Sequence, residues 1–106
     1  MVKATQDYTA SDKDMARFWA KVEADPNSGC WLWSGYCDDA PRDYGRFCLR
    51  GKMLRAHRVA YHNLISAVPL ELEMDHLCRV KSCVNPSHLE PVTSGENTRR
   101  WQVDVF

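Results

Sequence analysis

The spacing of apolar residues along the chain predicts three helices. The first covers residues 11–25 and begins with Ser11, a residue type that is favoured at helix N-caps. The second covers residues 56–67 and ends before Pro69, since proline does not continue a helix. The third is expected to begin near Ser94, within a TSGE sequence that has the spacing of a capping box.

Alternation of apolar and polar residues predicts short strands between these helices. Two of them form a hairpin, because a glycine-containing turn at residues 50–52 separates residues 44–49 from residues 53–55. The other predicted strands cover residues 30–33, 70–77 and 89–92. The intervening segments 34–43 and 78–88 lack periodicity and are predicted to be loops.

The chain has 106 residues and a mass of 12.2 kDa, which is the size of one small domain. We interpret residues 1–10 as a flexible arm and residues 11–106 as a single domain, with a core motif at about residues 70–101. No apolar run approaches the roughly 18 residues of a membrane span, and the N-terminus lacks a signal-peptide core. The sequence therefore predicts a soluble, cytoplasmic protein with no membrane partner.

The formal net charge is zero, which argues against a protein that coats nucleic acid without specificity. The charges are unevenly distributed, however, because residues 42–62 carry six basic side chains and one acidic one. This segment is either a phosphate-facing surface or an ordinary solvated hairpin. The candidates for nucleic-acid contact are Arg46, Arg50, Lys52, Arg55 and Arg58.

Two cysteines and a histidine at regular spacing indicate a zinc site. Cys78, Cys83 and His88 lie within eleven residues and offer soft donors that suit tetrahedral zinc. A closed structural site needs a fourth ligand, and we favour Cys30, which lies in a turn at the start of a predicted strand. The other available donors are Cys37, Cys48, His57 and His62. The alternative is that Cys78 and Cys83 are free thiols or form a disulfide.

A second set of residues contains the acid–imidazole pair Asp75-His76 at the end of a predicted strand. Such a pair is weak evidence alone, since a histidine at a strand end is commonly structural. Asn97 strengthens the interpretation, because it lies at the start of the helix expected to pack against this strand. These three side chains could therefore meet.

The run DHLCRVKSCVNPSHLE at residues 75–90, followed by Glu96-Asn97, resembles the HNH endonucleases with the ββα-metal fold. Within that family, it is most similar to the zinc-containing branch that resembles the His-Cys box homing endonucleases. Weaker similarity extends upstream, so the resemblance covers roughly residues 15–100. It implies an α+β fold: a small, zinc-stabilised ββα-metal domain with an N-terminal helix and a β-hairpin.

The resemblance also implies a role for each matching residue. His76 corresponds to the general base, Asn85 to the residue that braces the loop, and Asn97 to a ligand of a catalytic divalent cation. Asp75 corresponds to a second ligand of this cation. The structural zinc ligands correspond to Cys30, Cys78, Cys83 and His88. The last motif position is Asn here, where the family name has His.

The expected activity is therefore hydrolysis of DNA to 5′-phosphate and 3′-hydroxyl ends, with Mg²⁺ or Mn²⁺ as the catalytic cation and Zn²⁺ as the structural one. A cationic side chain should hold the scissile phosphate, and we prefer Arg58 to Arg55. The competing interpretation is a non-catalytic, zinc-stabilised DNA-binding module. A double-strand break requires a homodimer or two successive nicks, and a phage or mobile-element origin is implied only at the level of the family.

Four further donors have no assigned function in this scheme. We expect Cys37 and Cys48 to be unligated, and His57 and His62 to be structural or surface residues.

Overall fold

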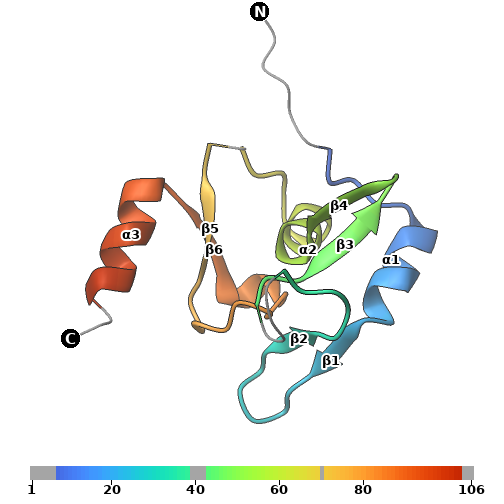
Figure 1. Cartoon of the computed structure of the whole chain (residues 1–106), viewed down its shortest axis with the longest axis horizontal. Helices are drawn as coiled ribbons and strands as arrows, with labels where there is room; N and C mark the ends of the chain where they lie inside the picture. The colour runs from blue at the N-terminus through green and yellow to red at the C-terminus, as the bar shows by residue number, and fades with distance from the viewer. Residues whose placement is uncertain (1–6, 39–42, 70, 104–106) are drawn as a thin grey trace, which may run out of the picture.

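The protein is described by a computed structural model that covers residues 7–38, 43–69 and 71–103, with side chains through Arg100. The element order begins with α1 (Asp12–Trp19), β1 (Val22–Ala24) and β2 (Trp31–Trp33). It continues with β3 (Arg46–Leu49), β4 (Lys52–Arg55) and α2 (Ala56–Leu64). The C-terminal part comprises β5 (Glu73–His76), the 3₁₀ turn η1 (Pro86–His88), β6 (Leu89–Val92) and α3 (Ser94–Val103) (Figure 1).

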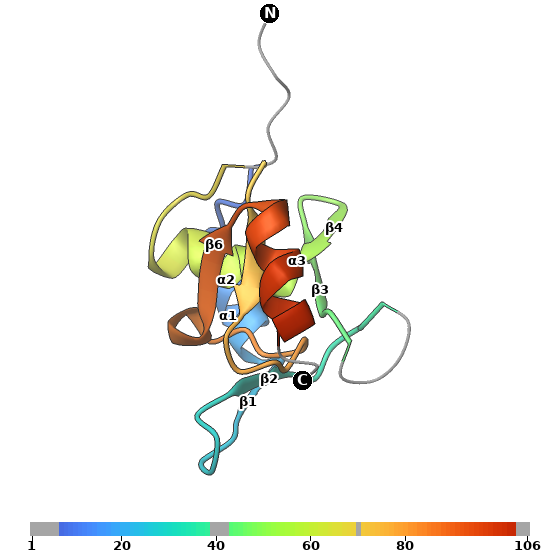
Figure 2. The same ribbon diagram turned by 90° about the vertical axis from the view of Figure 1, so that its left-hand side faces the viewer.

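The strands form three antiparallel hairpins, β1–β2, β3–β4 and β5–β6. The β5–β6 hairpin lies between α2 on one side and α3 on the other, as the two perpendicular views agree (Figures 1 and 2). Its register pairs Glu73 with Val92 and His76 with Leu89. The predicted α+β class, with a strand–strand–helix unit at the C-terminal end, is confirmed.

Local sequence signals account for several element ends. Ser11 caps α1 through a capping box with Asp14, and Thr93 Oγ1 accepts a hydrogen bond from the Glu96 N–H at the start of α3. The β3–β4 turn consists of Arg50 and Gly51, both with positive φ (50° and 79°), which suits the twist of a two-residue hairpin.

The predicted helix 11–25 is too long, because α1 ends at Trp19 and Val22–Ala24 forms β1. Pairing with β2 overrides the local helical pattern, since Val22 lies opposite Trp33 and Ala24 lies opposite Trp31. The predicted helix 56–67 likewise ends at Leu64.

The predicted strand 70–77 is also longer than the one observed. It is reduced to β5, Glu73–His76, while Leu70 lies outside the described residues. Leu77 lies beyond the paired residues of β5, and its N–H donates to the His88 carbonyl.

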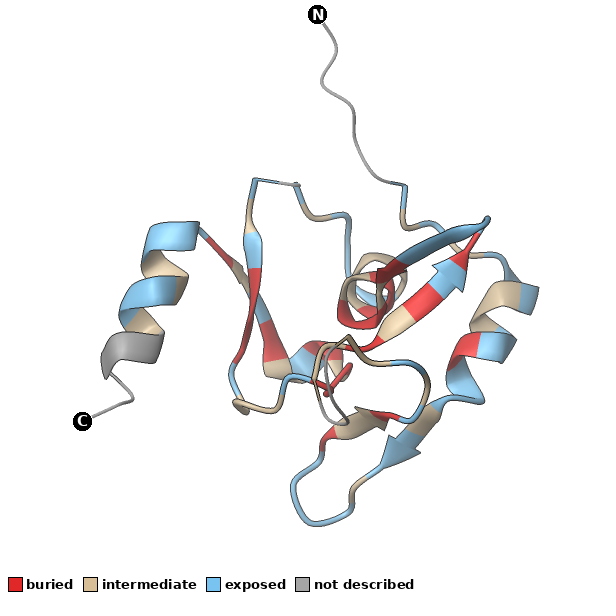
Figure 3. Cartoon of the chain, in the orientation of Figure 1, coloured by how far each residue is buried: buried red, intermediate tan, exposed pale blue. Residues whose placement is uncertain are grey.

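The main core lies between α1, β2, the β3–β4 hairpin and α2 (Figure 3). Aromatic rings fill its centre, with the Phe18 ring 4.9 Å from the Trp33 ring and 5.3 Å from the Phe47 ring. The buried members of this core are Phe18, Trp33, Phe47, Leu49, Leu54, Ala56, Val59, Ala60 and Val84.

The described part of the N-terminal arm contacts this core region. The Asn63 side chain donates to the Tyr8 carbonyl and accepts from the Ala10 N–H, and Arg50 donates to the carbonyls of Asp7 and Thr9. The earlier residues of the predicted arm, 1–6, lie outside the described residues.

No helix among the described residues has both the length and the apolar composition needed to cross a membrane.

Candidate functional site

Four soft donors converge next to the β5–β6 hairpin. The ligand atoms of Cys30, Cys78, Cys83 and His88 all lie within 4.8 Å of one another. The Sγ atoms of Cys30 and Cys83 are each 3.6 Å from His88 Nδ1. A tetrahedral zinc ion with ordinary Zn–S and Zn–N bonds places sulfur and nitrogen about 3.6 Å apart. The residues therefore fit zinc, and the cluster could hold it.

Backbone pairing brings Cys30 to the other three donors. β2 lies beside the loop after β5, where the Trp33 N–H donates to the Ser82 carbonyl (3.0 Å) and the Val84 N–H donates to the Trp31 carbonyl (2.8 Å). Cys30, which directly precedes β2, therefore lies near Cys83.

Asn85 connects the two segments that carry these donors. Its Nδ2 donates to the Gly29 carbonyl (2.8 Å), while its Oδ1 accepts from the Ser87 N–H (3.0 Å). Gly29 has φ +76°, a conformation that other residues adopt at a cost. These contacts are consistent with a bracing role for Asn85.

The thiols of this cluster need a compensating charge to ionise. Burial raises the pKa of Cys83 to about 12 and also raises the pKa of Cys78. A divalent cation would supply this charge, so binding of a cation and loss of the thiol protons are coupled.

His76 lies at the end of β5 and is almost completely buried. Its Nε2 is 3.1 Å from the Cys83 carbonyl oxygen. A carbonyl can only accept, so Nε2 carries the proton and Nδ1 keeps a lone pair in the neutral ring. Burial lowers the pKa of His76 to about 4, so the imidazole is neutral at pH 7.

Two rings pack against His76. The His57 ring centroid is 4.8 Å from that of His76, and the Tyr44 ring is 5.7 Å away. His57 is buried, and its Nδ1 has no hydrogen-bond partner among the described residues. Burial holds the pKa of His57 well below its usual range.

A polar pocket of about 340 Å³ opens beside these rings. It is lined by Tyr44, Arg55, His57, Arg58, Glu73, Met74 and Asn97. The guanidinium of Arg55 lies 4.4 Å from the centre of the Tyr44 ring, and Lys81 Nζ lies 5.5 Å from it. The pocket thus combines cationic groups with an imidazole, a carboxylate and an amide, a set that suits a phosphate and a hard cation.

Asn97 reaches this pocket from the first turn of α3. Its Nδ2 donates to Glu73 Oε1 at 2.7 Å. Its Oδ1 is buried and has no partner among the residues that the structure describes. The acceptor capacity of this amide oxygen is therefore unused among the described residues.

Asp75 is not brought into the pocket. Its side chain is fully buried, with Oδ1 3.0 Å from Arg79 Nη1 and Oδ2 3.0 Å from Arg100 Nη1. A cation at this carboxylate would compete with two guanidinium groups. The contact with Arg100 connects α3 to β5, while the expected role of Asp75 as a cation ligand stays a prediction.

The predicted basic surface is divided in the structure. Arg55 and Arg58 line the pocket, and Arg58 also donates to the Leu72 carbonyl. Arg46 instead forms a two-bond ion pair with Asp38 (2.6 and 3.2 Å), and Arg50 contacts Asp7. Lys52 is exposed at the start of β4.

Sequence reasoning missed Tyr44, His57 and Glu73 as pocket residues. The alternation in 70–77 placed Glu73 on the same face as Asp75, which was the available signal for that residue. The sequence pattern gave less indication for Tyr44 and His57. Both line the pocket because of how the β3–β4 hairpin and α2 pack in the fold.

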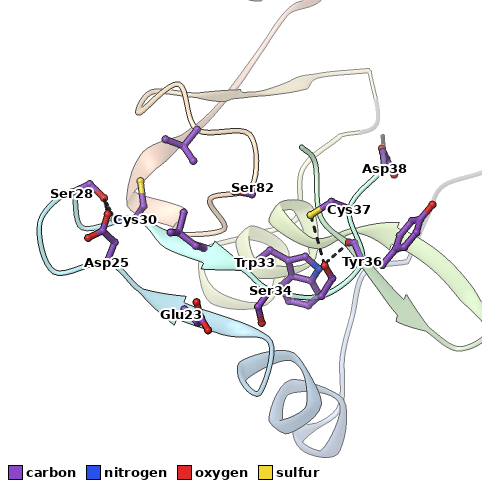
Figure 4. A pocket seen from close by; sticks show the side chains of 13 residues that line it. Glu23, Asp25, Ser28, Cys30, Trp33, Ser34, Tyr36, Cys37, Asp38 and Ser82 are labelled. Atoms are coloured by element: carbon purple, nitrogen blue, oxygen red, sulfur yellow. Dashed lines mark hydrogen bonds between the residues drawn. The ribbon is translucent and has the colours of Figure 1, made fainter. Parts of the chain in front are cut away.

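A second and larger hollow, about 990 Å³, runs along β2 and the following loop (Figure 4). Its acidic lining residues are Glu23, Asp25 and Asp38, and neither His57 nor Asn97 lines it. A surface with these charges repels phosphate, so the smaller pocket is the candidate site.

Comparisons with known proteins show similarity to one protein family and to two phage proteins. Residues 54–99 match the family model described as HNH endonuclease. The chain is 30% identical over 69 residues to Protein 7.7 of Escherichia phage T7, which covers 65% of this chain and 52% of that protein. It is 35% identical over 74 residues to Protein 2.8 of the same phage, and this alignment covers 68% of this chain and 48% of that protein.

The chain thus spans about half the length of these curated relatives. The search of solved structures found no significant match. The matched family segment contains β5, β6, Cys78, Cys83, His88 and Asn97, and it supports a nuclease-type function.

Proposed function

Because residues 54–99 belong to the HNH endonuclease family, we propose that this protein is a divalent-cation-dependent DNA endonuclease. The observation that carries the proposal is the pocket lined by Arg55, Arg58 and Asn97. The buried ring of His76 lies behind this pocket, packed against the lining residue His57. These groups match the requirements of phosphodiester hydrolysis, in which a water must lose a proton and a phosphate must be held.

His76 is the proposed general base. The Cys83 carbonyl fixes the proton on Nε2, so Nδ1 is the atom that accepts the proton of the attacking water. Packing against His57 and Tyr44 keeps the ring in one orientation.

Asn97 Oδ1 is the proposed ligand for Mg²⁺ or Mn²⁺. When bound, such a cation neutralises charge that develops on the phosphate and on the departing 3′ oxygen. Asp75 could join it only by giving up its contact with Arg79 or Arg100, and its role as a cation ligand stays a prediction.

Arg55 and Arg58 are the proposed contacts for the scissile phosphate. Arg58 uses one nitrogen for the Leu72 carbonyl, whereas Arg55 stacks on Tyr44 and keeps its edge donors for an oxygen anion. Arg46, Arg50 and Lys52 are proposed to contact DNA only outside the pocket.

The structural cofactor is proposed to be Zn²⁺ on Cys30, Cys78, Cys83 and His88, braced by Asn85. The similarity to the His-Cys box branch, the cytoplasmic location, the phage or mobile-element origin and a homodimer stay predictions.

Nicking of supercoiled plasmid with and without Mg²⁺ tests the proposal. We expect Mg²⁺-dependent nicking that leaves 5′-phosphate ends, and a loss of roughly 10²- to 10⁴-fold in rate for His76→Ala. His76→Gln is the matched variant, because its amide can still donate to the Cys83 carbonyl but cannot act as a base.

Either variant rejects the assignment of His76 if it folds, retains zinc and nicks DNA at the unmutated rate. If the unmutated protein binds DNA but never cleaves it with Mg²⁺ or Mn²⁺, the chain is the non-catalytic binding module instead.

A further inference from the structure

A single hydrogen bond connects the first residue of β5 to the first turn of α3. Asn97 Nδ2 donates to Glu73 Oε1 at 2.7 Å, across 24 residues of sequence. Both side chains line the 340 Å³ pocket. Because the acceptor is ionised, this hydrogen bond is stronger than one between two neutral groups.

The chemistry of the two partners makes this bond directional. A side-chain amide can turn over and exchange its oxygen for its NH₂ group, with little change in shape. An ionised carboxylate only accepts hydrogen bonds, so it selects the orientation in which Nδ2 faces Glu73. The amide oxygen then points elsewhere, and Asn97 Oδ1 is indeed buried without a partner among the described residues.

We propose that Glu73 is a positioning residue that holds the Asn97 amide with its oxygen toward the pocket, ready to bind a hard divalent cation. This inference rests on the proposed function, which assigns Asn97 Oδ1 to that cation. The carboxylate also polarises the amide and increases the electron density on Oδ1, as outer partners of metal ligands do.

The effect of Glu73 on the cation acts through Asn97 and not through direct ligation. Two features separate these roles. The carboxylate already has the Asn97 NH₂ group as a partner, and it is exposed to solvent at the start of β5. A direct ligand would keep its effect when Asn97 is replaced, whereas a positioning residue would lose it.

Titration of the zinc-loaded full chain with Mn²⁺, followed by the electron paramagnetic resonance signal of the free ion, measures cation affinity without relying on cleavage. We expect Glu73→Gln to weaken Mn²⁺ binding by about tenfold, because glutamine can donate as well as accept and no longer selects one amide orientation. Glu71→Gln is the matched control, since it removes the same charge from an exposed position two residues earlier and should leave the affinity unchanged.

The decisive comparison uses Asn97→Asp as the background. A carboxylate has two equivalent oxygens and needs no orientation, so Glu73→Gln should no longer weaken Mn²⁺ binding there. If Glu73→Gln weakens binding equally in both backgrounds, Glu73 is a direct ligand and the inference is wrong.

Two further results distinguish the inference from its premise. If Asn97→Ala weakens Mn²⁺ binding and Glu73→Gln does not, the positioning role alone is overturned. If Asn97→Ala leaves the affinity unchanged, the proposed cation site itself is overturned. Zinc content and the circular dichroism spectrum confirm that each variant is folded.

Discussion

The regions before and after residue 70 are held together by different interactions. In the first, an apolar core of aromatic and aliphatic side chains packs α1 against the β3–β4 hairpin and α2. Of the residues described after position 70, Val84 alone belongs to that core. The buried apolar residues of the β5–β6 hairpin lie outside it and are Met74, Leu89 and Val92.

The region after residue 70 is held together mainly by polar interactions. Backbone hydrogen bonds and the cysteine–histidine cluster connect the loop between β5 and η1 to β2. Ion pairs of Arg100 with Asp75 and Glu90 attach α3 to the hairpin. Apolar packing therefore stabilises the region before residue 70, while hydrogen bonds and ion pairs position the side chains of the candidate site after it. The two regions should respond differently to the same perturbation.

Loss of zinc should have the largest effect. Binding of structural zinc to small peptides is worth ~10–16 kcal/mol, whereas a domain is stable by only ~5–15 kcal/mol. We expect chelation or Cys83→Ser to unfold much of the region after residue 70. Hydrogen exchange should become fast in β5 and β6 while α2 and the β3–β4 hairpin keep more protection. Full protection of β5 and β6 in a zinc-free Cys83→Ser protein would falsify this view.

Gly45→Ala should damage the apolar region. A Cβ at this position would overlap the indole ring of Trp33, which is buried in the core. Overpacking of this kind costs ~1–3 kcal/mol, so the midpoint of denaturant unfolding should fall while zinc content is unchanged.

Gly95→Ala is the control for this substitution, because nothing lies within 4 Å of the added Cβ at the start of α3. Equal losses of stability in the two variants would contradict the assignment of the effect to Trp33.

Arg100→Ala should have the smallest effect, confined to α3. It removes the partner of three carboxylates, one of them the buried Asp75. We expect faster hydrogen exchange in α3 and weaker nuclease activity, with β3 and β4 unchanged. Arg99→Ala is the control, since Arg99 pairs with Glu96 at the exposed surface. Slow exchange in α3 of Arg100→Ala would show that this helix is attached by other means.

Much of the fold could be predicted because its signals are local. The capping residue Ser11, the turn at Arg50-Gly51 and the strand Leu89–Val92 depend on neighbours within a few positions. β1 could not be predicted, because Val22–Ala24 becomes a strand only through pairing with Trp31–Trp33, which follows it in the sequence.

The candidate site was predictable to a similar extent. The spacing of Cys78, Cys83 and His88 identified three donors, and a turn suggested Cys30. The pairing of Asp75 with Arg100 was not predictable, because it depends on the angle at which α3 meets β5 across 25 residues. The same holds for the contact between Asn97 and Glu73.

Cys83 contributes two atoms to two different sites, since its sulfur belongs to the cysteine–histidine cluster and its carbonyl oxygen accepts from His76. A newly synthesised chain that has not yet acquired its metal would lack a fixed tautomer at His76 as well as an ordered loop. Acquisition of the ion and fixation of the His76 ring would then be one event.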